Sequence, residues 1–278
     1  MTKSSIDALV ARETLERLEY VDHADLADRT AALYRRWCQT IPFDNLLRRI
    51  RVADSNPELP GTTPDEFLAS FLAHGAGGLC VPGAMALRAL LQWVRVPADL
   101  VSAHYCEFVD CSEPDNHLTV VADVGRRLLV DPTLLLGEPI ELGSPGGSGH
   151  TLPLSWSQRR NDGVLVIEVR TALTGRPGFL RVSGLRPRSP RFAQLLYART
   201  QGHRFFRDFN RTSYVRLNDG DGAMAACGPL FAARTGCADP GPILLEPEQM
   251  QETLSTRFGY SAELVRRLPE FHQTSHVG

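Results

Sequence analysis

A cysteine beside a glycine-rich turn is the first candidate nucleophile in this chain. Residues 75–82 read Gly-Ala-Gly-Gly-Leu-Cys-Val-Pro, and glycines this dense favour a sharp turn with positive φ over a regular element. Apolar residues at helical spacing follow, and Pro82 is tolerated only in the first turn of a helix. Cys80 is therefore expected at a helix N-terminus, where free N–H groups and the helix dipole favour a thiolate.

A thiolate nucleophile usually needs a base, and the base needs a carboxylate or amide that orients it. His117 begins a predicted strand over residues 117–122, and Asp131 ends another over 126–131. A hairpin centred on Val124 makes His117 and Asp131 direct partners on one face, with Cβ atoms roughly 4.5–5.5 Å apart. The carboxylate is then expected to accept the Nδ1–H of His117, which leaves Nε2 for the thiol. A turn shifted by one residue would break this direct pairing.

Each of these residues also has an ordinary structural interpretation. Most intracellular cysteines are small buried residues. A histidine at a strand edge is often a surface residue, and an aspartate before Pro132 often forms a turn. His104, in the preceding strand, is the alternative base. The cysteine turn together with a His117 and Asp131 pair on one face favours the catalytic interpretation.

The length, composition, net charge and cysteine pattern of the chain argue against several classes of protein. The chain has 278 residues, is 43% hydrophobic and 22% charged, and carries a net charge of −2, which predicts a globular protein with no electrostatic reason to bind nucleic acid. We expect no membrane segment and no signal peptide, hence a cytoplasmic location. The six cysteines form no C-x-x-C pair, so we expect no metal site and no redox motif.

The pattern along the chain predicts helices first, strands second and a mixed end, which indicates an α+β fold whose strands cluster on themselves. Thr63-Pro64-Asp65-Glu66 is a strong helix start. Residues 141–163 are rich in Gly, Ser, Pro, Arg and Asn and are predicted to form a loop or linker. Predicted strands lie over residues 100–108, 117–122, 126–131, 164–170, 179–183, 212–217 and 231–234, and the last helices begin near 246.

Several motifs, in this order and spacing, resemble the arylamine N-acetyltransferase family. Ile-Pro-Phe-Asp-Asn-Leu at 41–46 is similar to the family's I-P-F-E-N-L, and Gly-Gly-Leu-Cys at 77–80 to its R-G-G-Y-C. His117 and Val130-Asp131 follow at spacings like those of the family's catalytic histidine and V-D-V-G-F-G aspartate. A weaker match covers residues 205–210 and 258–259.

The resemblance implies a fold and a mechanism. The fold would be a helical bundle over residues 1–97 carrying Cys80, a central antiparallel β-barrel over 98–200 carrying His117 and Asp131, and an α/β lid over 201–278, around a core like that of papain-like proteases. The mechanism would be ping-pong, with acetyl-CoA or another acyl-CoA as co-substrate, no tightly bound cofactor and a small amine as acceptor. Thr119 matches a position that touches coenzyme A in relatives.

The sequence departs from the family at the turn and after the aspartate. The family's arginine is Ala76, the residues after the cysteine are Val81 and Pro82, and the acid of I-P-F-E-N-L is Asp44, one methylene shorter. If the family's acid and arginine form an ion pair, this chain holds its turn in another way. After Asp131, the family's V-G-F-G becomes Pro-Thr-Leu-Leu over 132–135, which the resemblance implies alters the pocket wall on the acceptor side.

Three hypotheses remain open beside a fourth, weaker one. The first is the acyltransferase with a Cys80 thioester. The second is an amide synthase that takes its acyl group from a carrier-protein thioester in natural-product biosynthesis. The third is a catalytically inactive relative that serves as a binding protein. A thiol protease or transglutaminase can use the same triad, but the family-like spacing and the C-terminal segment count against it.

Overall fold

Five helices fill the first third of the chain, which the sequence had marked as helical. The computed structural model describes residues 6–106, 115–143, 147–151, 154–161, 164–170, 177–200, 211–220, 222–235 and 241–271. The predicted start at Thr63 is confirmed, since its hydroxyl accepts the N–H of Glu66 at 3.1 Å and Pro64 opens the helix. The five are α1 (Ala8–Arg17), α2 (Leu26–Thr40), α3 (Leu46–Ala53), α4 (Pro64–His74) and α5 (Cys80–Trp93).

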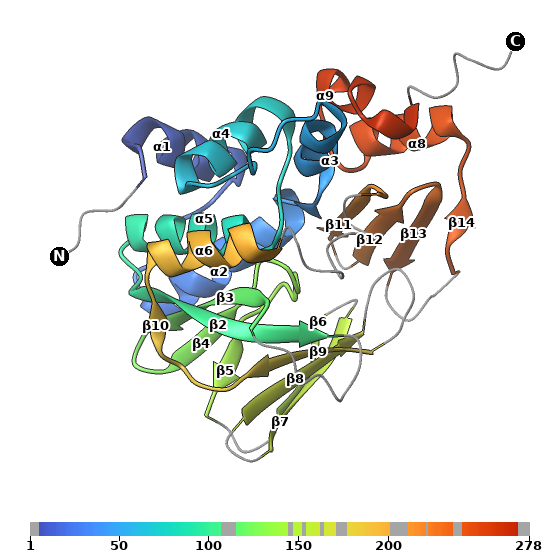
Figure 1. Ribbon diagram of the computed structural model, residues 1–278. Helices are drawn as coiled ribbons and strands as arrows, with labels where there is room; N and C mark the ends of the chain where they lie inside the picture. The colour runs from blue at the N-terminus through green and yellow to red at the C-terminus, as the bar shows by residue number, and fades with distance from the viewer. Residues whose placement is uncertain are drawn as a thin grey trace, which may run out of the picture.

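Helix α5 is the centre of the molecule. Eleven of its fourteen residues are buried, and a helix that is apolar on all sides belongs in a core. It contacts α4 and α6 (Pro190–Thr200) on one side and strands β2 (Ala98–Cys106) and β3 (His117–Asp123) on the other. Figure 1 shows it between the outer helices and the large sheet. This burial fixes the position of its first residue, Cys80.

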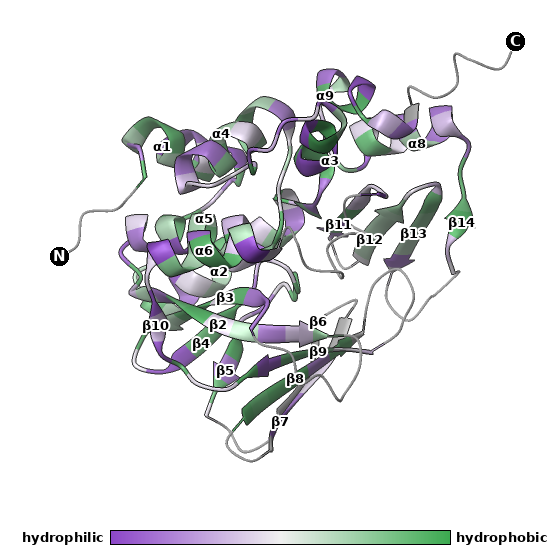
Figure 2. Cartoon of the chain, in the orientation of Figure 1, coloured by the Kyte–Doolittle hydropathy of each residue, from purple (hydrophilic) through white to green (hydrophobic). Residues whose placement is uncertain are grey.

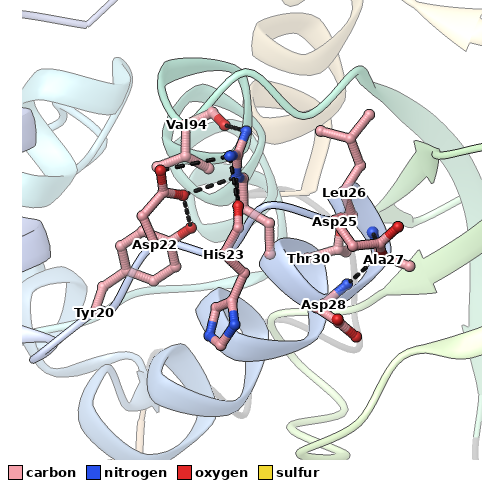
Figure 3. A network of polar contacts seen from close by, with 10 residues as sticks. Tyr20, Asp22, His23, Asp25, Leu26, Ala27, Asp28, Thr30 and Val94 are labelled. Carbon is pink, nitrogen blue, oxygen red and sulfur yellow. Dashed lines mark hydrogen bonds and ion pairs between the residues drawn. The ribbon is translucent and has the colours of Figure 1, made fainter.

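A network around Arg29 attaches the loop between α1 and α2 to the far end of α5 (Figure 3). The guanidinium donates to the carbonyl of Val94 at 3.0 Å and lies 2.7 Å from Asp22, whose carboxylate also accepts the hydroxyl of Tyr20 at 3.0 Å. None of the helices within the described residues is long and apolar enough to cross a membrane.

The large sheet is antiparallel, with its strands in the order β5-β4-β3-β2-β9-β8-β7-β6 and β10 added beside β2. In Figure 1 it curls beneath α5 and α2. Closure into a barrel, and the division at residues 97 and 200, stay predictions. The strands are β2 (Ala98–Cys106), β3 (His117–Asp123), β4 (Arg127–Val130), β5 (Ile140–Leu142), β6 (Gly147–Thr151), β7 (Leu154–Asn161), β8 (Val164–Arg170), β9 (Pro177–Val182) and β10 (Pro187–Arg188).

The predicted register of the β3–β4 hairpin was wrong by one residue at the turn. The pairs are Val120 with Val130 and Asp123 with Arg127, so the turn is centred on Gly125, whose φ is +81°, and not on Val124. Moving the centre by one residue moves every partner by two. His117 is therefore displaced along the strand from Asp131, but both stay on the same face because strand side chains alternate with a period of two.

The prediction of a loop over residues 141–163 was also wrong, because β6 and β7 form a hairpin there that pairs with β8. Strand β7 is polar over most of its length, so it lacks the apolar alternation that marks a strand in the sequence. Figure 2 shows it as a hydrophilic ribbon beside the hydrophobic β8. Its backbone pairing, which the sequence does not encode locally, makes it a strand.

A second, smaller sheet joins the two ends of the chain. Its order is β1-β11-β12-β13-β14, and β1 (Phe43–Asp44) comes from the helical third of the sequence. Phe43 pairs with Arg216, and helices α8 and α9 cover this region (Figure 1). The remaining elements are β11 (Tyr214–Asp219), β12 (Gly222–Cys227), β13 (Leu230–Thr235), β14 (Ile243–Leu244), α8 (Pro247–Thr256), α9 (Ala262–Arg266) and the 3₁₀ turn η1 (Pro269–Phe271).

Candidate active site

Cys80 is the first residue of α5, as the sequence predicted, and it is 6% exposed. The first N–H groups of a helix have no acceptor within the helix, and they form its positive end. Pro82 has no N–H, so Cys80 and Val81 supply the donors nearest the sulfur. The helix begins without a side-chain cap, because Leu79 occupies the cap position.

The glycine turn exists because two chain segments approach each other too closely for side chains. A Cβ on Gly77 would lie 1.7 Å from the carbonyl oxygen of Pro42. Gly75 ends α4 with φ of +69°, in the left-handed region that favours glycine. A parallel bridge joins Phe43 to Gly78 beside this contact. The segment at 42–44 therefore sets the position of the residues that precede Cys80.

Asp44 holds the turn in place through three hydrogen bonds, and it forms no ion pair with any of the residues that the structure describes. Its Oδ2 accepts the N–H of Gly77 at 2.7 Å and the hydroxyl of Tyr260 at 2.9 Å, and its Oδ1 accepts the N–H of Leu46 at 3.0 Å. Burial raises the pKa of Asp44 to about 6, although the three donors lower it. Ala76, where the family has arginine, is fully buried. Neutral donors, one of them a tyrosine from near the C-terminus, thus hold the acid of this motif.

His117 and Asp131 meet in the buried interior, with Nε2 2.7 Å from Oδ2. The expected ring orientation was wrong, because Asp131 faces Nε2 and not Nδ1. Interaction with Cys80 raises the pKa of His117, so the thiol lies near the ring, and Nδ1 is the ring nitrogen left to face it. The contact survives the shifted register because a diagonal neighbour across two strands stays within reach of a long side chain.

Asp131 is fully buried and well supplied with donors. Its Oδ1 accepts the N–H groups of Thr133 at 2.8 Å and Leu134 at 2.9 Å. Burial raises the pKa of Asp131, but the charge and hydrogen bond of His117 and these two N–H groups outweigh it, so the pKa is lowered. The hydroxyl of Tyr34 donates to its backbone carbonyl at 2.8 Å. The carboxylate is therefore charged and fixed in orientation.

The protonation of His117 follows from the same contacts. Burial alone lowers the pKa of His117, but the charge of Asp131, the hydrogen bond to it and the contact with Cys80 raise it to about 10. An imidazolium thus stands beside Cys80 at neutral pH, and a cation next to a sulfur favours the thiolate. The arrangement can supply a nucleophile together with a proton donor.

The other residues singled out in the sequence do not join the group of Cys80, His117 and Asp131 as direct partners. His104, the alternative base, follows Ala103, which pairs directly with His117, so His104 lies on the opposite face of the sheet. Thr119 lies on the face of His117 and is fully buried. Its contact with coenzyme A stays a prediction. Residues 205–210, part of the weaker motif match, lie outside the described residues, as do Cys111 and Cys237.

Two neighbours of the site were missed by the sequence. The ring of Tyr105 lies 6.1 Å from that of His117, and Asn116 fixes the Tyr105 backbone through hydrogen bonds of 2.8 and 2.9 Å. Arg48 on α3 is 3% exposed; burial lowers its pKa, and Cys80 is among the groups that raise it, which places Arg48 near the sulfur. Strand alternation from His117 and its partner Ala103 was the available signal for Tyr105. No local pattern marked Arg48.

Comparison with known proteins identifies the fold. No family model and no curated protein matches the sequence. The structure matches a variant of the Mycobacterium smegmatis arylamine N-acetyltransferase with a TM-score of 0.77 and 17% identity over 94% of this chain and 98% of that one. It matches the Mycobacterium marinum enzyme in complex with CoA with a TM-score of 0.78 and 15% identity, over 94% and 98%.

A third match is an arylamine N-acetyltransferase from Bacillus cereus with a Cys-His-Glu catalytic triad, with a TM-score of 0.71 and 16% identity over 90% of this chain and 98% of that one. The chain therefore has the α+β fold of arylamine N-acetyltransferases, and the resemblance found in the sequence motifs is confirmed at the level of the fold. At this identity the comparison carries the fold alone.

Proposed function

We propose that this chain is an acyltransferase of the arylamine N-acetyltransferase type. It takes an acetyl or other short acyl group from coenzyme A onto Cys80 and passes it to an amine. The observation that carries the proposal is the buried contact of 2.7 Å between His117 and Asp131, together with the influence of Cys80, the first residue of α5, on the pKa of His117. The shared fold supports the same reaction class.

The chemistry has two halves with His117 moving the proton in each. The Cys80 sulfur attacks the carbonyl carbon of the acyl thioester, the bond from that carbon to the coenzyme A sulfur breaks, and the leaving sulfur takes the proton of His117. The amine nitrogen then attacks the acyl group on Cys80 and gives a proton to His117, and Cys80 leaves as thiolate. Asp131 keeps the ring oriented throughout.

The backbone at the start of α5 offers stabilisation for the oxyanion that forms in both halves. The N–H groups of Cys80 and Val81 lie at the positive end of the helix, beside the sulfur to which the carbonyl carbon bonds. Coenzyme A as donor is supported by the Mycobacterium marinum enzyme in complex with CoA. Thr119 is the residue that we propose to approach the cofactor, and a cytoplasmic location is part of the same proposal.

Intact mass measurement after mixing with acetyl-CoA tests the proposal. We expect one acetyl group per wild-type chain, its release on addition of an aromatic amine, and no adduct on Cys80→Ala of unchanged circular dichroism. If no short acyl-CoA labels the wild-type chain, the proposal is wrong.

An amide synthase that uses a carrier-protein thioester is the second candidate. The segment after Asp131 favours it, because Pro-Thr-Leu-Leu replaces the family's V-G-F-G there and both leucines are buried. Asn218 holds this segment through the carbonyl of Leu135 at 2.7 Å, and Arg216 through that of Thr133. Labelling of Cys80 by an acylated carrier protein, but not by acyl-CoA, would select this candidate.

The inactive-relative hypothesis rested on the missing arginine and on the changed residues after the cysteine. The hydrogen bonds from Gly77 and Tyr260 to Asp44 remove the first reason, since they hold the turn without that cation. The second reason, the changed residues after the cysteine, is tested by the rate at which Cys80 is alkylated. A thiol as slow as a free cysteine at neutral pH would favour a binding protein over an enzyme.

A further inference from the structure

Two side chains of the small sheet reach the segment that follows Asp131. Arg216 and Asn218 lie on one face of β11, because strand side chains two residues apart point the same way. They are 5% and 4% exposed. The guanidinium of Arg216 donates to the carbonyl of Thr133. The side-chain amide of Asn218 donates to the carbonyl of Leu135 at 2.7 Å, so the small sheet holds this segment at two carbonyl groups.

The hydrogen bond from Arg216 is carried to the Asp131 carboxylate by a single peptide group. The carbonyl of Thr133 and the N–H of Leu134 belong to the same peptide group, and in a trans peptide they point in opposite directions. That N–H donates to Oδ1 of Asp131 at 2.9 Å, while Oδ2 lies 2.7 Å from Nε2 of His117. A donor on the carbonyl side polarises the peptide group and strengthens its N–H as a donor. Arg216 therefore acts through the backbone on the carboxylate that orients His117.

Asn218 reaches the backbone of Asp131 by a similar route. The peptide group whose carbonyl it holds supplies the N–H of Leu136, which donates to the hydroxyl of Tyr34 at 3.2 Å. That hydroxyl donates to the backbone carbonyl of Asp131 at 2.8 Å. The two routes thus end on two different groups of the same residue, its carboxylate and its backbone carbonyl.

Leu135 lies between the two held peptide groups in a backbone conformation that needs support. Its φ is +48°, in the left-handed region that is unfavourable for a residue other than glycine, and its side chain is fully buried. Such a conformation persists only where the surroundings fix the backbone on both sides. Loss of the Arg216 donor is therefore expected to let the segment relax and to move the N–H groups that hold Asp131.

The backbone of Arg216 belongs to the part of the molecule that sets the glycine turn. Arg216 pairs with Phe43, and Phe43 forms the parallel bridge to Gly78, two residues before Cys80. Figure 1 shows its strand, β11, beside α2 in the middle of the molecule, and the two elements are in contact. One residue thus links the turn that precedes Cys80, through its backbone, to the Asp131 carboxylate, through its side chain.

We propose that Arg216 is a positioning residue for the group of Cys80, His117 and Asp131, assisted by Asn218. It fixes the N–H groups that hold the Asp131 carboxylate and keeps that carboxylate in register with the turn before Cys80. The effect on the rate of acyl transfer rests on the proposed function, whereas the effect on His117 does not depend on any acyl donor.

Two variants separate the hydrogen bond of Arg216 from its charge. Arg216→Met keeps a long side chain without donor or charge, and Arg216→Lys keeps a charged donor of different shape. Nitrogen NMR of the imidazole, assigned with His117→Phe, follows the pKa of His117. Loss of a nearby cation alone would raise that pKa, because the imidazolium would be repelled less. Loss of the alignment of Asp131 lowers it, because the imidazolium loses its partner.

We expect the pKa of His117 to fall in Arg216→Met and to recover in part in Arg216→Lys. Alkylation of Cys80 by iodoacetamide and its acetylation by acetyl-CoA should both slow by about 10- to 100-fold in Arg216→Met, the size expected when reacting groups are misplaced by about 1 Å. Arg49→Met is the matched control, because Arg49 is 9% exposed and pairs with Glu270. It should lose stability but keep the wild-type pKa of His117 and the wild-type rates.

The inference is overturned if the pKa of His117 stays or rises in folded Arg216→Met, if both rates stay at the wild-type value, or if Arg49→Met has the same effects. If Arg216→Met does not fold, Arg216→Lys carries the test alone, with changes in the same direction but smaller. Its charge is kept, so a lower pKa of His117 then reports alignment only. A wild-type chain that acetyl-CoA does not label contradicts the proposed function, while the NMR and alkylation results still decide the role of Arg216.

Discussion

The ion pair of His117 and Asp131 sets the charge beside Cys80 over a wide range of pH. The pKa of His117 is raised to about 10, so the stability from its protonated form is full below its unfolded value near 6.5 and is lost as the pH rises through 10. The pKa of Asp131 is lowered, so its contribution is present above about 3.8 and is lost as the pH falls further. The pair is therefore intact through the neutral range.

Replacing Asp131 by asparagine should trap the wrong tautomer of His117. The N–H groups of Thr133 and Leu134 both donate to Oδ1, so the amide oxygen of the variant will stay there and its NH₂ will face Nε2. His117 must then carry its proton on Nδ1, toward the sulfur. We expect the rate of acylation to fall by about 10³–10⁴-fold, measured by single-turnover mass spectrometry.

Asp131→Glu is the control for this change, because it keeps the carboxylate. It should retain more activity than the asparagine variant, and nitrogen NMR of His117 should show the changed tautomer only in the latter. Equal rates for Asp131→Asn and the wild type would show that Asp131 does not orient the base.

Alkylation at neutral pH should select Cys80 over Cys38 and Cys227. Burial raises the pKa of Cys38 to about 12 and also raises that of Cys227, so both stay protonated thiols. Cys80 lies at a helix N-terminus beside a charged imidazole. Peptide mapping after brief treatment with iodoacetamide at pH 7 should find Cys80 modified at least tenfold faster than Cys38, on the order expected for an activated thiolate.

His117→Phe, which removes the imidazole and keeps an aromatic ring, should abolish most of that preference. If Cys38 reacts as fast as Cys80 in the wild type, the imidazole does not activate the nucleophile.

At the scale of elements, the β3–β4 hairpin shows why the sequence predicted the right contact from the wrong pairing. Alternation in a strand fixes which face a side chain occupies, and that property survived a turn centred on Gly125 in place of Val124. The exact partner and the ring nitrogen that faces Asp131 depend on register and rotamer, which no local pattern encodes. Faces are predictable from sequence, whereas contacts between particular atoms are not.

The glycine turn predicts a large difference between two glycine-to-alanine changes. In Gly77→Ala the new methyl group would meet the backbone oxygen of Pro42 at 1.7 Å. The segments at 42–44 and 75–78 cannot move apart freely, because the carboxylate of Asp44 accepts the backbone N–H of residue 77. We expect a loss of about 3 kcal/mol or more in the free energy of unfolding. Gly184→Ala meets nothing within 4 Å and should change it by no more than about 0.5 kcal/mol. Urea denaturation of both variants checks this.

If the two variants have equal stability, the close approach of the backbones at Gly77 is not what fixes the turn. A loss of acylation in Gly77→Ala without a loss of stability would mean instead that the turn serves only to place Cys80.

At the scale of the whole molecule, the segment around Gly259 packs against the glycine turn. A Cβ on Gly75 would lie 2.3 Å from the carbonyl oxygen of Gly259, and the N–H of Ser261 donates to the carbonyl of His74 at 3.0 Å. The sequence predicted helices on both sides of Gly259. It could not predict that they meet residues 74–77, because contacts between distant segments leave no periodic signal.

Tyr260 is the side chain through which this contact reaches Asp44, and its effect depends on pH. The folded pKa of Asp44, about 6, is above its unfolded value near 3.8, so ionisation of Asp44 costs stability as the pH rises from 4 through 6. The hydroxyl of Tyr260 lowers that pKa, so Tyr260→Phe should raise it and increase the cost. We expect a loss of about 1.5–3 kcal/mol at pH 8 and clearly less at pH 5, from urea unfolding at both values.

Tyr20→Phe is the matched control, because it removes a hydroxyl that donates to the exposed carboxylate of Asp22. Its effect should be smaller at both pH values. The acylation rate of Tyr260→Phe separates two roles of this contact. If the acylation rate of the variant falls only at pH values at which the chain begins to unfold, Tyr260 contributes to stability alone. A rate that falls in the folded protein at pH 8 and recovers toward pH 5 shows that the charge of Asp44, held by Tyr260, positions the turn that carries Cys80.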